Sequence, residues 1–433
     1  MNRRDFIQST SSTAFSTLVL PSFLHNLQDP IKLAIVGTGW WGTDFLLKNV
    51  LVSGLYEVVG LCDVDAAAMD NAANKVVAAG GKKPQLFSDY KAMYKMPGLQ
   101  AVIIATPPHW HALHFIDACK AGLHVFLEKP ISYDIREGQA MLEAHRKANN
   151  VVMVDFPRAM LDTNQKVKDF IKSGEAGKIL QVQANIYNPE GNLVEKPIPT
   201  NFDFETYCGP APRNKFMCSG NANKPNWRGM HDFSRGIMVD WGIHYLNNVR
   251  RVMDLDLPEK VWATGGIVKL TGQENPDHLD VRFDFGNLPV YWTHKTWGYN
   301  SPTPEHNIGV YYFGEKATIF AGDAGWEVFA ANSKDKVTRF AAEGTPGDQA
   351  ALMFQRLFTE FANGVRNKSN AGITNTLEDA FKTTSMVIYG DLAYQVKAPL
   401  AIDTKMMNIQ NNKAAQALLK RKYRAPYQHP FNG

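Results

Sequence analysis

Asp240 and His244 have the residue types and the spacing that proton transfer requires. They stand four residues apart, so on a helix the carboxylate and the imidazole would share one face. A carboxylate in that place can orient a general base and stabilise its cationic form. Lys129 follows an apolar stretch and could polarise a substrate hydroxyl or carbonyl oxygen. Taken alone, the same residues also fit a capping acid, a packed histidine and a surface lysine paired with Glu128.

A glycine-rich turn near the start of the chain has the spacing of a dinucleotide-binding loop. Apolar residues 32–36 run into Gly37-x-Gly39-x-x-Gly42, and we expect a helix from Thr43 to Val50. Gly37 permits a tight turn, Gly39 lets the backbone approach a pyrophosphate, and Gly42 lets the helix pack on the sheet. The expected cofactor contacts of this loop are Gly37, Gly39, Trp40, Trp41 and Gly42.

A carboxylate at the end of the next strand indicates which nucleotide is bound. Residues 58–62 form an apolar run that ends in Asp63, about 20 residues after the glycines. Such a carboxylate accepts hydrogen bonds from the adenosine ribose hydroxyls and repels a 2′-phosphate. The sequence therefore predicts a site for NAD rather than NADP.

Short apolar strands alternate with helical segments from Ile31 to about Asp155, which predicts a parallel sheet covered on both faces. Ligands bind outside the carboxyl ends of such strands. Thr106, Glu128 and Lys129 each follow a strand of this kind, so we expect them on the cofactor side of the sheet together with Asp155.

The pattern changes after Pro157, where apolar and polar residues alternate with period 2 at 180–186 and 279–285. This alternation predicts a largely antiparallel sheet with helices on one side. Further strands are expected at 261–270, 289–297, 308–313 and 316–321, helices at about 349–364 and 376–395, and a long irregular segment at 189–233.

The predicted fold class is therefore α/β, with an N-terminal Rossmann domain and a C-terminal α/β domain that has a large, open, mostly antiparallel sheet. We divide the chain into an export signal with linker, an NAD-binding domain, and a domain for substrate binding and oligomerisation. Their expected bounds are residues 1–29, 30–156 and 157–433.

Composition excludes several classes of partner. The net charge of the 433 residues is only +4, and no basic stripe interleaves with aromatic residues, so no nucleic-acid partner is expected. No stretch approaches the roughly 18 apolar residues of a membrane span. The basic cluster at 420–424 is expected to be a solvated tail. No metal site is expected, because His109, His111 and His114 begin a helix beside a cofactor strand, and the four cysteines lack zinc spacing.

The N-terminus resembles a twin-arginine export signal. Arg3 and Arg4 precede serine and threonine residues and a short apolar region, 14–20. This predicts a periplasmic protein, with a cytoplasmic protein that carries a disordered tail as the alternative. Because NAD is scarce outside the cytoplasm, export implies a cofactor that is loaded first and then held tightly.

Taken together, these motifs resemble the Gfo/Idh/MocA family, named for glucose-fructose oxidoreductase and inositol dehydrogenase. The resemblance rests on the glycine loop with Asp63, the Thr106-Pro107 turn with His111, the Glu128-Lys129-Pro130 motif and the Asp240-x-x-x-His244 motif. It implies a sugar or polyol substrate and an open second-domain sheet that mediates homo-oligomerisation. It adds Thr106, Pro107, His111, Glu128, Lys129 and Arg158 to the expected cofactor contacts.

The resemblance also implies a role for each motif residue. Lys129 would be the catalytic lysine, in a cis bond to Pro130, His244 the acid/base and Asp240 its partner. Family members commonly carry a Gln-Arg pair after the sixth strand, and this chain keeps only the arginine of that pair, as Arg158. We expect substrate contacts from Lys129, Trp227, Arg228, Asp240 and His244.

The leading expectation is hydride transfer between a carbohydrate carbinol and nicotinamide, which gives a keto-sugar. The alternative is an NAD-dependent glycoside hydrolase that works by transient oxidation, elimination and re-reduction. A non-catalytic NAD-dependent sensor is a third class, against which Lys129, Asp240 and His244 argue. A serine hydrolase has no support, because no Gly-x-Ser-x-Gly elbow occurs.

Overall fold

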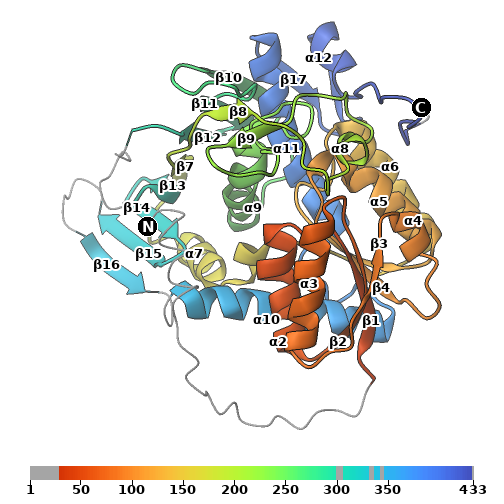
Figure 1. The fold of residues 1–433 in the computed structure, drawn as a ribbon. Helices are drawn as coiled ribbons and strands as arrows, with labels where there is room; N and C mark the ends of the chain where they lie inside the picture. The colour runs from red at the N-terminus through yellow and green to blue at the C-terminus, as the bar shows by residue number, and fades with distance from the viewer. Residues whose placement is uncertain (1–28, 299–305, 331–335, 342–345, 432–433) are drawn as a thin grey trace.

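The computed structural model describes residues 29–298, 306–330, 336–341 and 346–431. They form a six-stranded sheet, a ten-stranded sheet and a small two-stranded sheet, with helices packed on both large sheets (Figure 1). The predicted α/β fold class is confirmed. No helix in these ranges is both long enough and apolar enough to span a membrane. The expected N-terminal signal lies outside the described residues.

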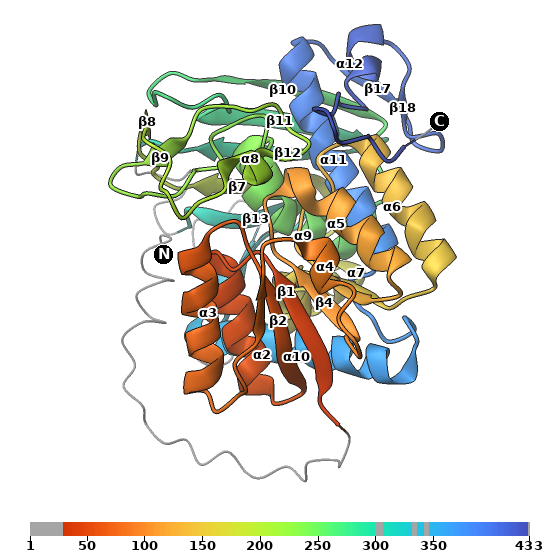
Figure 2. The same ribbon diagram turned by 45° about the vertical axis from the view of Figure 1, so that its right-hand side comes forward.

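The first sheet is parallel and has the strand order β3-β2-β1-β4-β5-β6. Its central strands are almost fully buried because helices cover both faces, which explains their unbroken apolar sequences. The strands are β1 (Ile31–Val36), β2 (Tyr56–Cys62), β3 (Gln85–Phe87), β4 (Ala101–Ile104), β5 (His124–Leu127) and β6 (Val152–Val154). The helices between them are α2 (Lys48–Ser53), α3 (Ala66–Ala78), α4 (Tyr90–Met93), α5 (Pro108–Lys120) and α6 (Ile135–Ala148) (Figure 2).

The helix that follows the glycine loop differs from the prediction. It begins at Trp41 rather than Thr43, and its first part, Trp41–Leu47, is wound as a π-helix that continues into α2. A π-helical segment has i→i+5 hydrogen bonds and a wider turn, which redirects side chains relative to an α-helix, and such segments are frequent at functional sites. The helical pattern in the sequence carries no signal for this local change.

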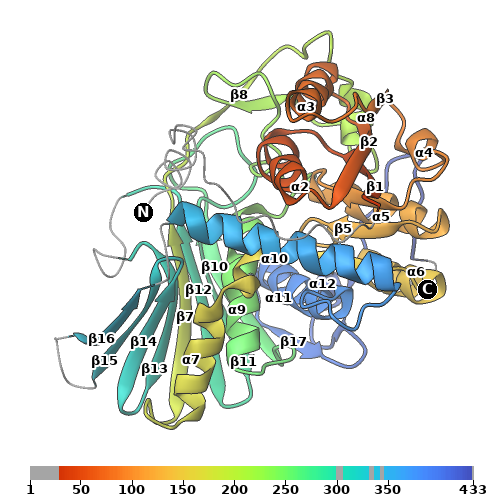
Figure 3. The same ribbon diagram turned by 90° about the horizontal axis from the view of Figure 1, so that it is seen from below.

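Helix α10 (Pro346–Asn367) packs on the first sheet although it comes after most strands of the second sheet in the chain (Figure 3). The Phe358 ring stacks on Phe126 of β5 at 4.9 Å, and the Tyr56 hydroxyl donates to the Phe358 carbonyl at 2.6 Å. Phe354 and Phe361 belong to the same buried cluster. The sequence placed this helix in the second domain, whereas in the structure it completes the helix layer of the first.

The second sheet has the strand order β16-β15-β14-β13-β7-β12-β11-β10-β17-β18 and is antiparallel except where β7 pairs with β12. Its strands are β7 (Ile179–Tyr187), β10 (Lys260–Gly266), β11 (His278–Phe285), β12 (Leu288–Lys295), β13 (Ile308–Gly314), β14 (Ala317–Gly322), β15 (Gly325–Ala330), β16 (Lys336–Ala341), β17 (Leu400–Asp403) and β18 (Asn408–Ile409). Along one face lie α7 (Asp162–Lys172), α9 (Ile243–Val252) and α11 (Leu377–Val396) (Figure 3). The prediction of a large, mostly antiparallel sheet is confirmed, although β15 to β18 were not anticipated.

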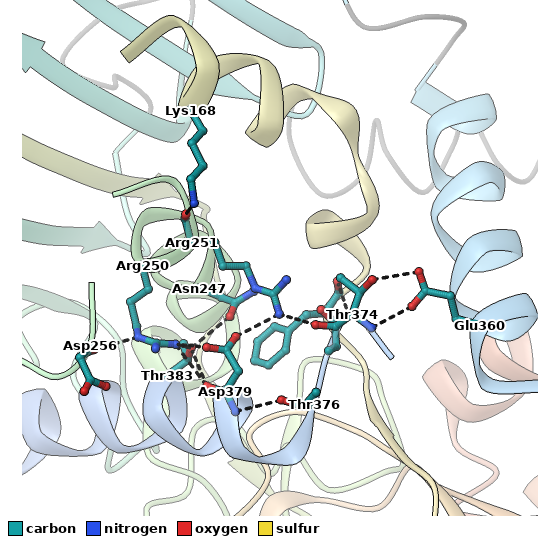
Figure 4. Close-up of polar contacts among 12 residues, drawn as sticks. Lys168, Asn247, Arg250, Arg251, Asp256, Glu360, Thr374, Thr376, Asp379 and Thr383 are labelled. Carbon is teal, nitrogen blue, oxygen red and sulfur yellow. Dashed lines mark hydrogen bonds and ion pairs between the residues drawn. The ribbon is translucent and has the colours of Figure 1, made fainter. Parts of the chain in front are cut away.

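A polar network joins the helices that support the site (Figure 4). Arg250 of α9 donates to the Thr383 hydroxyl at 2.7 Å and to the Asp379 carboxylate at 3.1 Å, both on α11. Because the Arg250 side chain is 3% exposed, losing these acceptors would leave a buried cation unpaired. The loop before α11 also pairs with β6, where the Val154 N–H donates to the Asn375 carbonyl at 3.0 Å. This network fixes α9, and so His244, relative to the first sheet.

The segment 189–233, expected to be irregular, contains β8 (Leu193–Glu195), α8 (Phe204–Cys208), β9 (Met217–Ser219) and an apolar cluster of its own. A hydrogen bond and an ion pair connect this segment to the loop after β2. The Asp203 N–H donates to the Val64 carbonyl at 2.9 Å, and Lys224 pairs with the Asp65 carboxylate at 3.0 Å. The segment therefore closes over one end of the first sheet.

The basic C-terminal cluster is not a solvated tail. After α12 (Lys413–Ala417), Arg421 is mostly buried and donates from Nε to the Glu137 carboxylate at 2.8 Å. Tyr427 meets the Trp110 ring edge-on, with 5.3 Å between ring centroids. The sequence expectation failed because the buried acid that pairs with Arg421 lies 284 residues earlier in the chain.

Candidate active site

A cavity of about 340 Å³ opens between the carboxyl ends of the first sheet and the second domain. Its wall brings together segments that are far apart in the sequence: the glycine loop, the ends of β2, β4 and β5, the segment 189–233 and the start of α9. The sequence-predicted residues that line it are Gly37, Gly39, Trp40, Trp41, Gly42, Asp63, Thr106, Pro107, Glu128, Lys129, Arg158, Trp227, Arg228, Asp240 and His244.

The glycine loop has the shape that a pyrophosphate requires. Gly37 has a φ of +93°, and a Cβ there would lie 2.6 Å from the Ala105 carbonyl carbon. A Cβ at Gly42 would lie 2.0 Å from the Gly37 oxygen. A Cβ at Gly39, by contrast, would meet no atom within 4 Å, so the backbone there borders open space. Two glycines therefore shape the loop and the third leaves room for a ligand at the start of a helix.

Asp63 is held in position by its own loop. Its Oδ2 accepts hydrogen bonds from the Thr38 N–H at 2.5 Å and the Thr38 hydroxyl at 3.1 Å, and its Oδ1 accepts from the Asp65 N–H at 2.9 Å. Burial raises the pKa of Asp63, and these hydrogen bonds oppose that effect. The Oδ1 atom accepts one hydrogen bond within the protein and can accept a second, as a ribose hydroxyl would require.

Lys129 and Asp240 are in direct contact. The Lys129 Nζ donates to the Asp240 carboxylate at 2.7 Å and to its backbone carbonyl at 2.6 Å, and the Lys129–Pro130 bond is cis, as the resemblance implied. Arg228 Nε donates to the other carboxylate oxygen of Asp240. Burial alone would raise the pKa of Asp240, but the two cations lower it well below its ordinary value. Asp240 is therefore an anion that holds Lys129 and Arg228 in place.

His244 does not pair with Asp240 as the sequence analysis expected. Residues Met238–Gly242 form a π-helical turn ahead of α9, and the Asp240 carboxylate is directed to Lys129 and Arg228. The His244 Nδ1 is buried and has no hydrogen-bond partner among the described residues. Burial, and after it the Lys129 and Arg158 cations, lower the pKa of His244 well below its usual value. The imidazole is therefore neutral at physiological pH and able to accept a proton.

Arg158 and His111 have partners within the protein. Arg158 donates from Nε and Nη2 to the two oxygens of the Asp323 carboxylate, at 2.8 and 2.7 Å, and it also lines the cavity. His111 is not among the residues that line the cavity. Its ring nitrogens lie 2.7 Å from the Pro130 carbonyl oxygen and 2.6 Å from the Thr106 carbonyl oxygen. His111 therefore connects the segments that follow β4 and β5 from outside the cavity wall.

Other cavity residues were missed by the sequence analysis. Trp110 and Tyr207 pack beside each other, Lys224 comes from the segment 189–233, and Met353 and Phe354 come from α10. The length of the segment 189–233 was a signal that it borders a site. No local pattern could show that α10 reaches the cavity, because that contact depends on how distant parts of the chain pack.

The fold and the cavity define a dinucleotide-binding protein built from a Rossmann domain and a second α/β domain. Residues 31–156 match the Gfo/Idh/MocA family model described as "Oxidoreductase family, NAD-binding Rossmann fold". Residues 160–280 match the model of the same family described as "Oxidoreductase family, C-terminal alpha/beta domain". The two matches together span more than half of the chain, which belongs to this oxidoreductase family.

Two curated relatives differ in the activity that they are named for. A "Glycosyl hydrolase family 109 protein" of Stenotrophomonas maltophilia is 28% identical over 194 residues, which are 42% of each chain. An inositol 2-dehydrogenase of Salmonella typhimurium is 32% identical over 161 residues, 36% of this chain and 46% of the relative. The chain thus spans less than half the length of either relative.

Solved structures share the fold over most of the chain. A levoglucosan dehydrogenase in complex with NADH and levoglucosan has a TM-score of 0.64 and 16% identity, and the likeness covers 87% of this chain and 100% of that one. An oxidoreductase from Agrobacterium radiobacter, in complex with NAD+, L-tartaric acid and magnesium, also has a TM-score of 0.64 and 16% identity, over 88% and 100% of the two chains. At these identities the likeness shows the two-domain fold alone.

Proposed function

We propose that the protein is an NAD-dependent oxidoreductase that acts on the CH–OH group of a sugar, polyol or glycoside and forms a keto-sugar. The observation that carries this proposal is the convergence of Lys129, His244 and the buried Asp240 anion on the cavity that the glycine loop also lines. In this proposal the second domain, beginning near residue 157, binds the substrate.

Each residue of the site would have a distinct part in the reaction. NAD supplies, when bound, an acceptor for the hydride of the carbinol carbon. The neutral His244 removes the hydroxyl proton, and Lys129 donates a hydrogen bond to the same oxygen as negative charge develops there. Asp240 positions Lys129. Trp227, with the Arg228 guanidinium 4.3 Å from its ring centre, offers an aromatic surface for a sugar ring.

The test is to add a panel of free sugars and glycosides to the purified protein and to follow reduced-nicotinamide absorbance, with and without added NAD. The absorbance should rise with one class of substrate, and His244→Ala should abolish the rise. His145→Ala is the matched control, because His145 lies on α6 and does not line the cavity. An undiminished rise in His244→Ala would refute the assigned base.

Glycoside hydrolysis is the second candidate, favoured by the relative named as a family 109 glycosyl hydrolase. It would begin with the same oxidation, use the acidified neighbouring C–H for elimination, and return the hydride at the end. Released aglycone without net NADH would identify this activity. Net NADH without aglycone would identify the dehydrogenase.

Tight retention of the cofactor and export through the twin-arginine route form a linked proposal. Retention is supported by the contacts of the segment 189–233 with the loop after β2, which include the Lys224–Asp65 ion pair at 3.0 Å. Lys224→Ala should speed the loss of nucleotide during gel filtration. Lys215→Ala, which removes an ion pair to Glu195 outside the cavity wall, should not.

Export is tested by cell fractionation. The wild-type chain should be found in the periplasm, and an Arg3→Lys, Arg4→Lys double variant should stay in the cytoplasm. If the wild type and the double variant divide equally between periplasm and cytoplasm, the export proposal fails and the cytoplasmic alternative stands.

A homo-oligomer that forms through the uncovered face of the second sheet is a further part of the proposal. Across β10, β11 and β12 this face carries Trp262, Arg282 and Tyr291 in register, and the Arg282 guanidinium lies 5.4 Å and 5.9 Å from the two ring centres. Trp262 is 36% exposed, and exposed aromatic residues beside an arginine are typical of interfaces. Trp262→Glu should convert an oligomer seen by light scattering into a monomer.

A further inference from the structure

Two acidic side chains lie together beneath the cavity. Glu128 directly follows β5 and Asp155 directly follows β6, and the parallel register that pairs Leu127 with Val154 sets them side by side. Glu128 is 6% exposed and lines the cavity, whereas Asp155 lies behind it and is 1% exposed. The two carboxyl groups lie close enough for each to shift the pKa of the other.

The hydrogen bonds around the pair do not support two negative charges. Glu128 accepts from the Trp41 indole N–H and from the Lys129 backbone N–H, the latter at 3.1 Å. Neither oxygen of Asp155 has a hydrogen-bond partner among the described residues, although the nearby Trp41 indole N–H favours the Asp155 anion by lowering its pKa. A buried carboxylate without a donor is costly, and two adjacent carboxyl groups avoid that cost by sharing a proton.

The cations nearby are engaged by other acids. Lys129 Nζ binds Asp240, as does Arg228, and Arg158 binds Asp323. Burial and the neighbouring carboxyl raise the pKa of Glu128 well above its ordinary value, and burial raises that of Asp155, while Lys129 acts in the opposite direction on both. His244, whose pKa Lys129 also lowers, is neutral. Of the two acids, Glu128 lines the cavity and Asp155 does not, so a charge bound in the cavity would face Glu128.

We propose that Glu128 and Asp155 share one proton in the protein and that the charge of the nicotinamide ring controls it. The pair gives up the proton to solvent when the site holds the oxidised, positively charged ring, and takes it back when the ring is reduced and neutral. Glu128 lines the cavity at the carboxyl end of β5, where it would face the nicotinamide end of NAD when the cofactor is bound.

The inference rests on the proposed function for the cofactor but not for the sugar. Oxidation of a carbinol by NAD+ yields a ketone, NADH and one proton. Before the reaction both carboxyl groups are ionised, and after it they share one proton. The pair therefore takes up one proton, which balances the proton that His244 passes to solvent. The positive charge lost from the ring is then matched by a negative charge lost from the pair. Glu128 and Asp155 are positioning residues that keep the buried charge constant.

Infrared spectroscopy of the carbonyl band of a protonated carboxyl group tests the proposal directly. The protein is measured without nucleotide, with NAD+ and with NADH, each in water and in heavy water to identify the exchangeable proton. We expect the band in the nucleotide-free protein and with NADH, and at least a tenfold weaker band with NAD+, the change that a pKa shift of two or more produces near neutral pH. A band of equal strength with NAD+ and NADH would overturn the proposal.

Variants assign the band to the pair. Asp155→Asn removes one member of the pair and with it the shared proton, so the change in the band between NAD+ and NADH should disappear. Glu143→Gln, a change at an exposed acid on α6, should leave the wild-type spectra unchanged. If Asp155→Asn does not fold, the wild-type comparison of NAD+ with NADH still decides the question. Absence of nucleotide binding would refute the proposed cofactor, while the band in the nucleotide-free protein would still test the shared proton.

Discussion

The three glycines of the loop should respond differently to a single added methyl group. In Gly39→Ala the new Cβ enters space in which no protein atom lies within 4 Å. In Gly42→Ala the new Cβ would lie 2.0 Å from the Gly37 carbonyl oxygen, a backbone atom that cannot move without opening the loop. One substitution therefore removes only room for the ligand, and the other also disturbs the protein.

The magnitudes follow from these distances. Gly39→Ala should change the free energy of unfolding by no more than about 0.5 kcal/mol, as is usual for a substitution that creates no clash. It should weaken NAD binding by at least about tenfold, or roughly 1.4 kcal/mol, because the methyl group occupies the path of the pyrophosphate. Gly42→Ala should cost about 1–3 kcal/mol of stability through overpacking and also weaken binding.

Chemical denaturation and nucleotide binding separate the two effects. Unfolding is followed by tryptophan fluorescence in nucleotide-free protein, and binding by calorimetric titration with NAD after any retained nucleotide has been removed. The reasoning fails if Gly39→Ala binds NAD as tightly as the wild type, since the open space would then not be the phosphate site. It fails equally if Gly39→Ala is as destabilised as Gly42→Ala.

Three further predictions concern the base, the C-terminal segment and α10. Because burial and cations lower the pKa of His244, its neutral form persists below pH 6.5. The value of kcat/KM should therefore stay level just below pH 6.5 and fall only in more acid solution. Lys129→Met removes one of the cations and should raise the His244 pKa, which NMR titration measures. Arg421→Met leaves a buried carboxylate unpaired and should cost about 3–5 kcal/mol in denaturant unfolding, whereas Lys422→Met, at an exposed position, should cost less than about 0.5 kcal/mol. Phe358→Ala should cost about 3–5 kcal/mol and speed hydrogen exchange in β5, and unchanged exchange there would contradict the packing of α10 on the first sheet.

Much of the first domain could be predicted from local sequence. Its central strands are almost fully buried and are therefore mostly apolar, and two positions that shape the loop are glycines because a Cβ would clash there. The carboxyl ends of neighbouring parallel strands meet at one edge of a sheet. For that reason Thr106, Glu128 and Lys129 could be placed at one site before any tertiary contact was known.

The pairing of charged groups could not be predicted in the same way. Asp240 and His244 are close in sequence, but the Asp240 carboxylate binds Lys129, which is 111 residues away, and Arg228. The π-helical turn at Met238–Gly242 changes the direction of side chains that an α-helix would align. Electrostatic partners depend on distance and burial in three dimensions, and sequence spacing carries little information on either.

By itself, the sequence of this protein determined the dinucleotide loop, the class of each domain and the set of residues that can do chemistry, because local backbone geometry and side-chain periodicity govern all three. Only the tertiary structure decided that α10 completes the first domain, that the segment 189–233 closes over the cofactor side, and that Arg421 is buried. It also decided that Glu128 and Asp155 lie side by side and that neither Asp155 oxygen has a hydrogen-bond partner among the described residues. These features depend on contacts between residues far apart in the chain, which no local pattern records.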